Sequence, residues 1–479
     1  MPDPLEDDPS AVLTALGQVM EAAERYLPTV PTRPATTGRS ALEAARALER
    51  LSGPGVGATA AVATLIDAAL AGATTSTGPR YLDFVVGGAT PAAMAADWLT
   101  ALIDQNAAGP GSSAWVTELE ASVLCRLVAL FGLPPSWSGV LTTSSMLASF
   151  TGLACATGWW GARQGVDVAE DGLAGLPPLP VFASALVHPT TRKALQMLGH
   201  GRRCVNACPD GADGRIDLDQ LERGLRRQGG AAVVIATAGD AGAGRFDPLA
   251  EMAALAERHG AWLHVDGAFG VYAALSPRSR HLLEGLERAD SVAADAHKWM
   301  NVPYESGFCL LRDPALLEPT FGMPAAAYLP GPAEGFRGFS VLGPESSRRA
   351  RALPIWASIA AYGTDGLAHM VERHLDAAAH LAACVRDEPD LELVLAPVSC
   401  VVCFRWTAGE PRAAGLDEQN RRLARALADD GRFALGTTVV EGVVALRAAL
   451  CNWRVRPADL DDLVHHVLQT ARVLSAPPP

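Results

Sequence analysis

The sequence has very little lysine. Its 39 basic residues include only two lysines, Lys193 and Lys298, and the rest are arginine. A lysine in such a chain suggests a task that needs a primary amine able to lose its proton and attack a carbonyl, which a guanidinium cannot do. The plain alternative is a codon bias that spared two lysines, so the surroundings of each residue must decide.

Charge is also scarce, and its balance is negative. Charged residues make up 19% of the 479 residues, and 39 basic against 52 acidic side chains give a net charge of −13. Nucleic acids and anionic membranes both need clustered cations, so neither is an expected partner. No apolar run approaches the ~18 residues that span a bilayer, and the first residues, MPDPLEDDPS, are acidic where a secretory signal is basic. We therefore expect a cytoplasmic protein.

The composition is that of a globular chain with large cores, because 49% of the residues are hydrophobic. The length predicts two to four domains. The nine cysteines lie mostly in apolar stretches, as thiols do in a reducing compartment. Cys400 and Cys403 form a CxxC pair, but it sits in the strand-like run VSCVVCFRW and has no second pair at zinc spacing. We expect no metal site there, and none in the functional site.

The pattern of elements changes twice along the chain. Residues 1–79 form helical patterns between Pro/Gly breaks and predict an N-terminal arm. Residues 80–350 alternate short apolar strands with amphipathic helices, which predicts an α/β domain with a mostly parallel sheet and a ligand at the carboxyl ends of its strands. Residues 351–479 mix helices and strands as a smaller α+β domain does.

Lys298 has surroundings that favour chemistry. It follows the strand-like run SVAADA, and Asp266 ends another strand in AWLHVDG. Two parallel strands that end in a carboxylate and an amine bring both groups to the same edge of a sheet. This arrangement suits pyridoxal phosphate (PLP), because the lysine can form a Schiff base with the cofactor while the aspartate keeps the pyridine nitrogen protonated.

Other parts of such a site follow from what the cofactor needs. The hydroxyl residues 142–145 precede an apolar helix and could bind the phosphate, His188 could stack on the ring, and Thr237 could donate to its substituents. Each also has a structural alternative: helix capping for the hydroxyl run and for His188, and a cap or turn for Asp266. Lys193 lies in the helical pattern TRKALQMLG and is expected at the surface.

The order of HVDGAFG, DAHKW, His188 with its flanks, SSRRARALPIW and LRAALCNW resembles the group II pyridoxal-dependent decarboxylases, which include the aromatic-L-amino-acid, histidine, glutamate and cysteine-sulfinate decarboxylases. The likeness extends from YLPTVPTRP through TELE to the last helix. It implies the aspartate-aminotransferase fold (PLP fold type I) and a homodimer that exchanges its N-terminal helical arms and has active sites at the subunit interface. It also implies catalytic roles for Lys298, His188 and Asp266, and cofactor contacts from Ser144, Ser145, His188, Thr237, Asp266, Ala268, Asp295, His297 and Lys298.

The sequence departs from that family at the phosphate turn and after Thr237. Met146 and Leu147 stand where the family usually has Ser-Glu, so the turn has fewer polar side chains. Gly239-Asp240 stands where Gly-Thr is common. The extra carboxylate could repel the phosphate or the substrate, or simply face solvent.

A third departure concerns the product. The aromatic decarboxylases carry a lid tyrosine that protonates Cα, but residues 329–361 contain no tyrosine; Phe336 or Phe339 falls near its place, and Tyr328 matches a different family residue. Phenylalanine transfers no proton. In resembling enzymes a phenylalanine there accompanies oxidative deamination by O2 to an aldehyde. The favoured alternative is a shorter lid, with another group or water supplying the proton, so that the amine is the expected product. Another PLP lyase or transferase and a non-catalytic relative are further alternatives.

For the expected amino-acid substrate, the sequence indicates only the class of side chain. The family takes pocket residues from the region near Tyr81 and Phe84, from the loop around Trp115 and from the partner subunit. These segments have no excess of the cations that would bind an acidic substrate. An aromatic or apolar amino acid is therefore favoured. Arg447 matches a recurrent family arginine of open role.

Overall fold

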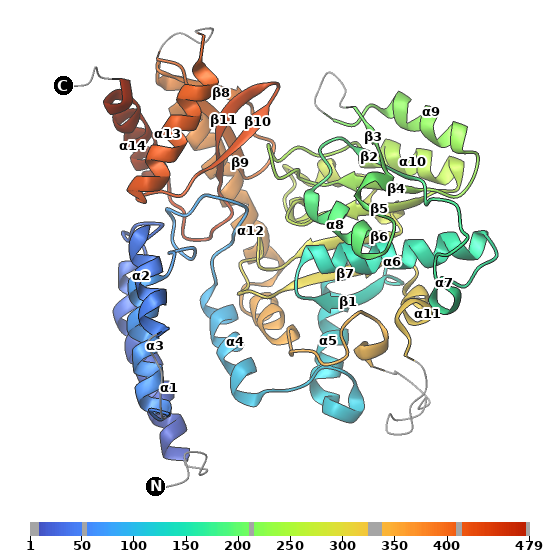
Figure 1. Cartoon of the computed structure of the whole chain (residues 1–479), viewed down its shortest axis with the longest axis horizontal. Coiled ribbons are helices and arrows are strands. Elements are labelled where there is room, and N and C mark those ends of the chain that lie inside the picture. Colours follow the sequence, from blue (N-terminus) through green and yellow to red (C-terminus); the bar gives the residue numbers. More distant parts are fainter. Residues whose placement is uncertain (1–8, 50–54, 210–214, 324–337, 409–413, 476–479) are drawn as a thin grey trace. The chain divides into compact units, whose positions relative to one another are not determined.

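The computed structural model describes residues 9–49, 55–209, 215–323, 338–408 and 414–475. The chain divides into two compact units (Figure 1). The larger comprises Gly87–Ala378 and Ala396–Val402, and the smaller comprises Met1–Val86, Ala379–Leu395 and Cys403–Pro479. The N-terminal segment thus groups with C-terminal residues in one unit. The division into an N-terminal arm (1–79), an α/β domain (80–350) and an α+β domain (351–479) stays a prediction.

The larger unit contains a seven-stranded sheet in the order β1-β7-β6-β5-β4-β2-β3. Neighbours among β2 to β6 pair in parallel, and β7 is antiparallel to both β6 and β1, which confirms the expected mostly parallel sheet. The strands are β1 (Ser138–Thr142), β2 (Val181–Ser184), β3 (Val205–Cys208), β4 (Val233–Thr237), β5 (Trp262–Asp266), β6 (Ser291–Asp295) and β7 (Gly307–Leu311).

Helices cover this sheet, and its central strands are therefore buried along their whole length. Helix α6 lies against β5, β6 and β7 and beside α8, while α9 and α10 contact β2, β4 and β5. Helix α12 breaks at Gly363, whose φ of 61° is a left-handed conformation that glycine adopts readily. The helices of this unit are α4 (Pro91–Ile103), α5 (Pro110–Leu130), α6 (Ser145–Arg163), α7 (Val168–Asp171), α8 (Pro189–Met197), α9 (Leu218–Gln228), α10 (Leu249–His259), α11 (Leu317–Phe321) and the first part of α12 (Ala352–Asp387).

The smaller unit combines a four-stranded sheet, in the order β10-β11-β9-β8, with helices from both ends of the chain. Its strands are β8 (Leu391–Leu395), β9 (Val401–Trp406), β10 (Gly436–Val440) and β11 (Val443–Ala449). Glu441 and Gly442 join β10 to β11 with φ of 51° and 81°, the two positive values of a tight hairpin turn. Helices α13 (Leu416–Asp430) and α14 (Pro457–Ser475) pack together, and α13 contacts β11.

The N-terminal helices of the smaller unit are α1 (Pro9–Tyr26), α2 (Arg39–Leu48) and α3 (Ala58–Gly72), and α3 contacts both α1 and α2. They leave large apolar side chains exposed, and α3 buries none of its residues. The exposed side chains include Val12, Leu13, Leu16, Met20, Leu42 and Leu65. Several large exposed apolar side chains on one group of helices suggest an interface.

Candidate active site

Three strands of the larger unit's sheet end in polar residues at one edge. Thr237 ends β4, Asp266 ends β5 and Asp295 ends β6. Thr237 and Asp266 are direct partners in the β4–β5 register, and Asp266 lies opposite Ala293, two residues before Asp295. The carboxyl edge of a parallel sheet is where α/β folds bind ligands. The structure therefore brings these predicted residues together.

Lys298 reaches this edge from the turn after β6. Its Nζ lies 3.1 Å from Oδ2 of Asp295, and its side chain is 22% exposed while that of Asp295 is only 2% exposed. Nε2 of His297 lies 3.5 Å from the other Asp295 oxygen, and burial lowers the pKa of this imidazole, which is therefore neutral at pH 7. The amine is thus fixed beside a buried carboxylate and stays accessible. Lys193, in contrast, is an exposed residue of α8.

The Asp266 carboxylate is buried and accepts two hydrogen bonds. Thr191 donates its hydroxyl at 2.9 Å, and the N–H of Ala268 donates at 3.3 Å. Thr191 lies in the first turn of α8, and His188 is the N-cap of that helix, with Nδ1 accepting the N–H of Thr190 at 3.2 Å. His188 therefore caps this helix, which was the structural alternative to ring stacking. The first turn of α8 links it to Asp266.

His264 was not singled out by the sequence analysis. It precedes Asp266 by two residues on β5, and its ring hydrogen-bonds to Ser291 and Ser149 at 2.8 and 3.4 Å. Burial lowers its pKa to about 4, while Asp266 acts in the opposite direction. The imidazole is therefore neutral at pH 7, so it places no positive charge beside the carboxylate. The signal in the sequence is a titratable residue inside the apolar strand WLHVD.

The turn from β1 into α6 carries the hydroxyl groups expected to bind phosphate. Ser144 is the N-cap of α6, and its side chain makes no capping hydrogen bond. Ser145 instead donates its N–H and its hydroxyl to Asp295, at 2.5 and 2.6 Å. A helix start leaves its first N–H groups without intrahelical partners, so Met146 and Leu147 offer backbone donors although their side chains are apolar. An anion at this turn would thus be bound by Ser144 and by the backbone, because Ser145 already bonds to Asp295.

A buried ion pair holds β1 directly before this turn. Arg348 lies 2.7 Å from Glu120, and the two side chains are 1% and 0% exposed. Leu141 of β1 donates its N–H to Glu120 at 3.1 Å and accepts a hydrogen bond from Arg348 at 2.6 Å. Glu120 and Arg348 belong to the TELE and SSRR motifs, which served above only as marks of resemblance. Their role in the structure is to fix the main chain of β1.

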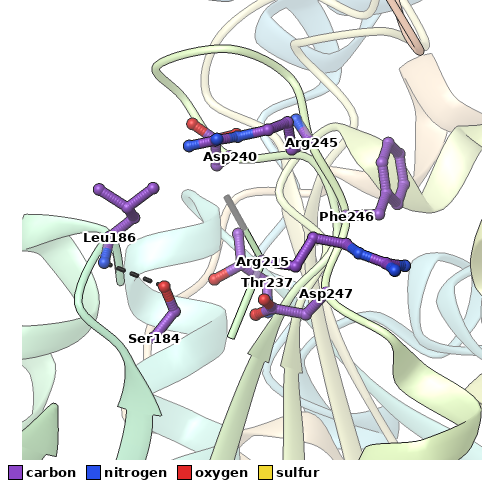
Figure 2. A pocket seen from close by; sticks show the side chains of 8 residues that line it. All are labelled: Ser184, Leu186, Arg215, Thr237, Asp240, Arg245, Phe246 and Asp247. Atoms are coloured by element: carbon purple, nitrogen blue, oxygen red, sulfur yellow. Dashed lines mark hydrogen bonds and ion pairs between the residues drawn. The ribbon is translucent and has the colours of Figure 1, made fainter. Parts of the chain in front are cut away.

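A small pocket with a cavity volume of about 10 Å³ lies at the ends of β2 and β4 (Figure 2). Asp240 lies at its rim, and its carboxylate accepts the N–H groups of Gly242, Ala243 and Arg245 at 2.8 to 2.9 Å. The Arg245 guanidinium lies 3.6 Å from the same carboxylate. Asp240 is thus buried within its own turn and does not face solvent, while repulsion of the phosphate or the substrate stays a prediction. The pocket is lined by Ser184, Leu186, Arg215, Thr237, Asp240, Arg245, Phe246 and Asp247.

Thr237 presents a buried hydroxyl to this edge. Its backbone N–H donates to Asp247 at 2.8 Å, which fixes the residue, but within the described residues its Oγ1 has no hydrogen-bond partner. A buried hydroxyl without a partner costs about 1–3 kcal/mol, so a bound polar group there stabilises the site. An accessible amine, a buried carboxylate, a helix start and a hydroxyl without a partner are together the groups that PLP requires. The residues present fit this cofactor.

The expected lid is described only in part. Phe336 and Tyr328 lie outside the described residues. Phe339 is buried, and the guanidinium of Arg348 lies 5.1 Å from the centre of its ring. This phenylalanine therefore packs on the buried ion pair that fixes β1.

Arg447 has a structural contact in the smaller unit. It extends from β11 and donates to the carbonyl of Phe84 at 2.9 Å. Phe84 has a φ of 51° and an exposed ring, and Tyr81 forms an isolated bridge with Ala434. Arg447 thus fixes the segment that contains two of the residues named for the substrate pocket. Trp115, the third, is an exposed residue of α5 in the larger unit.

Comparisons find known proteins similar to this chain over most of its length. Residues 64–407 match the family model described as the pyridoxal-dependent decarboxylase conserved domain. L-2,4-diaminobutyrate decarboxylase of Rhizobium meliloti is 34% identical over 394 residues, which cover 80% of this chain and 76% of that protein. Aromatic-L-amino-acid decarboxylase of Bacillus atrophaeus is 27% identical over 405 residues, 83% of this chain and 82% of that one.

Solved structures show the same architecture. The crystal structure of Oryza sativa TDC with PLP and tryptamine superposes with a TM-score of 0.89 at 25% identity, covering 99% of this chain and 100% of that one. Among the described residues, no helix combines the length and apolar character needed to cross a membrane.

Proposed function

Because the chain belongs to the pyridoxal-dependent decarboxylase family, we propose that it decarboxylates an L-amino acid to the amine and CO2, with Lys298 as the residue that carries the cofactor. The family is PLP-dependent, and the relatives named above are decarboxylases. The expected cofactor and the expected enzyme class are therefore confirmed. The observation that carries the proposal is the position of Lys298, 3.1 Å from Asp295 at the edge where Asp266 ends the neighbouring strand. When bound, PLP supplies an electron sink for the pair left on Cα as CO2 departs.

The described residues divide the work of binding. Asp266, kept in place by Thr191 and Ala268, would pair with the pyridine nitrogen. Ser144 and the start of α6 would bind the phosphate, Thr237 would bond to a ring substituent, and His188 and Ala268 would pack on the ring. Asp295, with His297 beside it, holds the Lys298 amine through charge.

The proposed substrate is an aromatic or otherwise apolar amino acid. Its support is the lack of a cation excess near Tyr81, Phe84 and Trp115 and the likeness to a protein named an aromatic-L-amino-acid decarboxylase. A diamino acid is the second candidate, favoured by the 34% identity to a protein named an L-2,4-diaminobutyrate decarboxylase. The two classes differ in the charge of the substrate side chain, so one panel of amino acids separates them.

We also propose that the enzyme acts as a homodimer in the cytoplasm. The support for the dimer is the exposed apolar side chains of α1, α2 and α3, such as Leu13 and Leu42, which are 71% and 60% exposed. An arm that buries so little apolar surface gains stability by covering that surface with a second copy.

A product assay on the holoenzyme tests the reaction. With a panel of L-amino acids, CO2, amine, ammonia and peroxide are measured together, and we expect CO2 and amine in equal amounts without peroxide. Aldehyde with ammonia and peroxide would replace this proposal with oxidative decarboxylation, the alternative that the missing lid tyrosine leaves open. No CO2 from any amino acid, with the cofactor bound, would refute decarboxylation itself.

A matched variant tests the role of Asp266. Asp266→Ala removes the carboxylate but leaves Lys298, so we expect it to retain some cofactor and to lose kcat by about 10²- to 10³-fold, as enzymes do when one electrostatic contact is removed. Thr191→Val removes one of the two donors to Asp266 and is the control, with a smaller loss. An unchanged rate in Asp266→Ala would show that this carboxylate is not the partner of the ring.

A further inference from the structure

Three side chains of different metal-binding types meet on the smaller unit. His380 and Cys384 lie one turn apart near the end of α12, and Asp461 lies in the first turns of α14. His380 Nε2 is 2.7 Å from Asp461 Oδ1, and Cys384 Sγ is 3.5 Å from each of these two atoms. An imidazole nitrogen, a sulfur and a carboxylate oxygen therefore form one small triangle, with all ligand atoms within 4.8 Å of one another.

The triangle has nearly the dimensions of one face of a tetrahedral zinc site. Bonds of about 2.0–2.3 Å to nitrogen, oxygen and sulfur place tetrahedral ligands roughly 3.3–3.8 Å apart. The two sulfur distances fall in that range, and the nitrogen–oxygen distance is shorter by about half an ångström. His380 and Asp461 have side chains 36% and 59% exposed, so they can separate by this amount without disturbing a core.

The same geometry does not suit a nucleophilic cysteine. A catalytic triad uses both ring nitrogens, one facing the nucleophile and the other facing the carboxylate. Here Nε2 of His380 faces both Cys384 and Asp461. Burial, followed by Asp461, raises the pKa of the Cys384 thiol, so the thiol stays protonated at pH 7 without a cation.

We propose that His380, Cys384 and Asp461 bind a divalent cation of the zinc type, with water in the fourth position. A thiolate and an imidazole select zinc, cobalt or cadmium over magnesium and calcium, which prefer oxygen ligands. The cation displaces the thiol proton and joins α12 to α14 within the smaller unit. The sequence did not reveal this site, because Asp461 lies 77 residues after Cys384.

Cobalt is the probe for the test, because a cobalt–thiolate bond gives a near-ultraviolet charge-transfer band. Tag-free holoenzyme is titrated with Co²⁺, and we expect the band to saturate at one equivalent per chain, to disappear when Zn²⁺ is added and to survive an excess of Mg²⁺. Cys384→Ser should abolish the band, and Asp461→Asn should weaken Co²⁺ binding by at least about tenfold. Cys125→Ser is the matched control, because this thiol is exposed elsewhere, on α5, and the band should be unchanged.

Cofactor absorbance and circular dichroism show that each variant is folded, and Asp461→Asn tests the site without touching the thiol. Absence of the band in the folded wild type overturns the proposal. So does a band that persists in Cys384→Ser or is lost in Cys125→Ser. The readout is independent of catalysis, so failure of the proposed decarboxylation leaves it intact.

Discussion

Glu120→Gln tests whether the buried ion pair is what fixes the strand before the phosphate turn. The substitution keeps the shape of the side chain but leaves the Arg348 guanidinium, 1% exposed, without its counter-charge. Removal of one partner of a buried pair costs about 3–5 kcal/mol. Because about 1.4 kcal/mol corresponds to a factor of ten, opening of β1 should become about 10²- to 10³·⁵-fold more frequent.

Hydrogen exchange of the apoenzyme, followed by mass spectrometry, measures this opening locally. The amide of Leu141 donates to Glu120, so peptides that contain β1 should lose protection by that factor. Asp97→Asn is the matched control, because Asp97 pairs with the neighbouring Arg349 at 2.5 Å in a partly exposed bridge worth about 1 kcal/mol or less.

The double variant Glu120→Gln/Arg348→Met removes both charges. It should recover much of the loss, because the cost comes from an uncompensated buried charge. If Glu120→Gln exchanges no faster than Asp97→Asn, or if the double variant is worse than the single one, the account of this pair is wrong.

Three further predictions concern the sheet edge. Thr237→Val should leave the stability of the apoenzyme unchanged or higher but weaken PLP binding by roughly 2- to 13-fold, the worth of one hydrogen bond, and equal PLP affinity would contradict the assigned contact. Burial lowers the pKa of His264 to about 4 in the folded state, below the ordinary histidine value of about 6.5. Unfolding therefore takes up a proton below about pH 6.5, and the free energy of unfolding should fall by up to about 3 kcal/mol as the pH drops from about 6.5 to about 4. His264→Gln should flatten this part of the stability curve measured by urea unfolding. Asp240→Ala should destabilise the apoenzyme by about 1–3 kcal/mol without tightening PLP binding, whereas tighter binding would mean that the carboxylate repels the phosphate.

The sequence predicted the strands that form mostly apolar runs, including the edge strands β1 and β8, and missed two strands of mixed exposure. The central strands β4, β5 and β6 appear as continuous apolar runs because each lies between two neighbours and under helices. The strands β3 and β10 end their sheets and were missed. Their residues alternate or mix exposure, as in the run Gly436–Val440, so no apolar run marks them.

The sequence predicted the site residues that sit at strand ends, because chain order places such residues at one edge. Contacts between residues far apart in the chain could not be predicted from the sequence. Ser145 binds Asp295 across 150 positions, and Arg348 binds Glu120 across 228 positions. These pairs depend on how β1, β6 and α5 pack. The burial of Asp240 was not foreseen for a related reason, since an aspartate that accepts the N–H groups of its own turn looks in a sequence like any exposed carboxylate.

The central claim is that Lys298 binds the cofactor. Because the chain has only two lysines, labelling can test this claim directly. Borohydride reduction of the holoenzyme followed by peptide mapping assigns the cofactor to one of only two lysine side chains, Lys298 at the sheet edge or Lys193 on the exposed side of α8. The account predicts the pyridoxyl label on the peptide that contains Lys298. Label on Lys193, or on neither lysine, would contradict it.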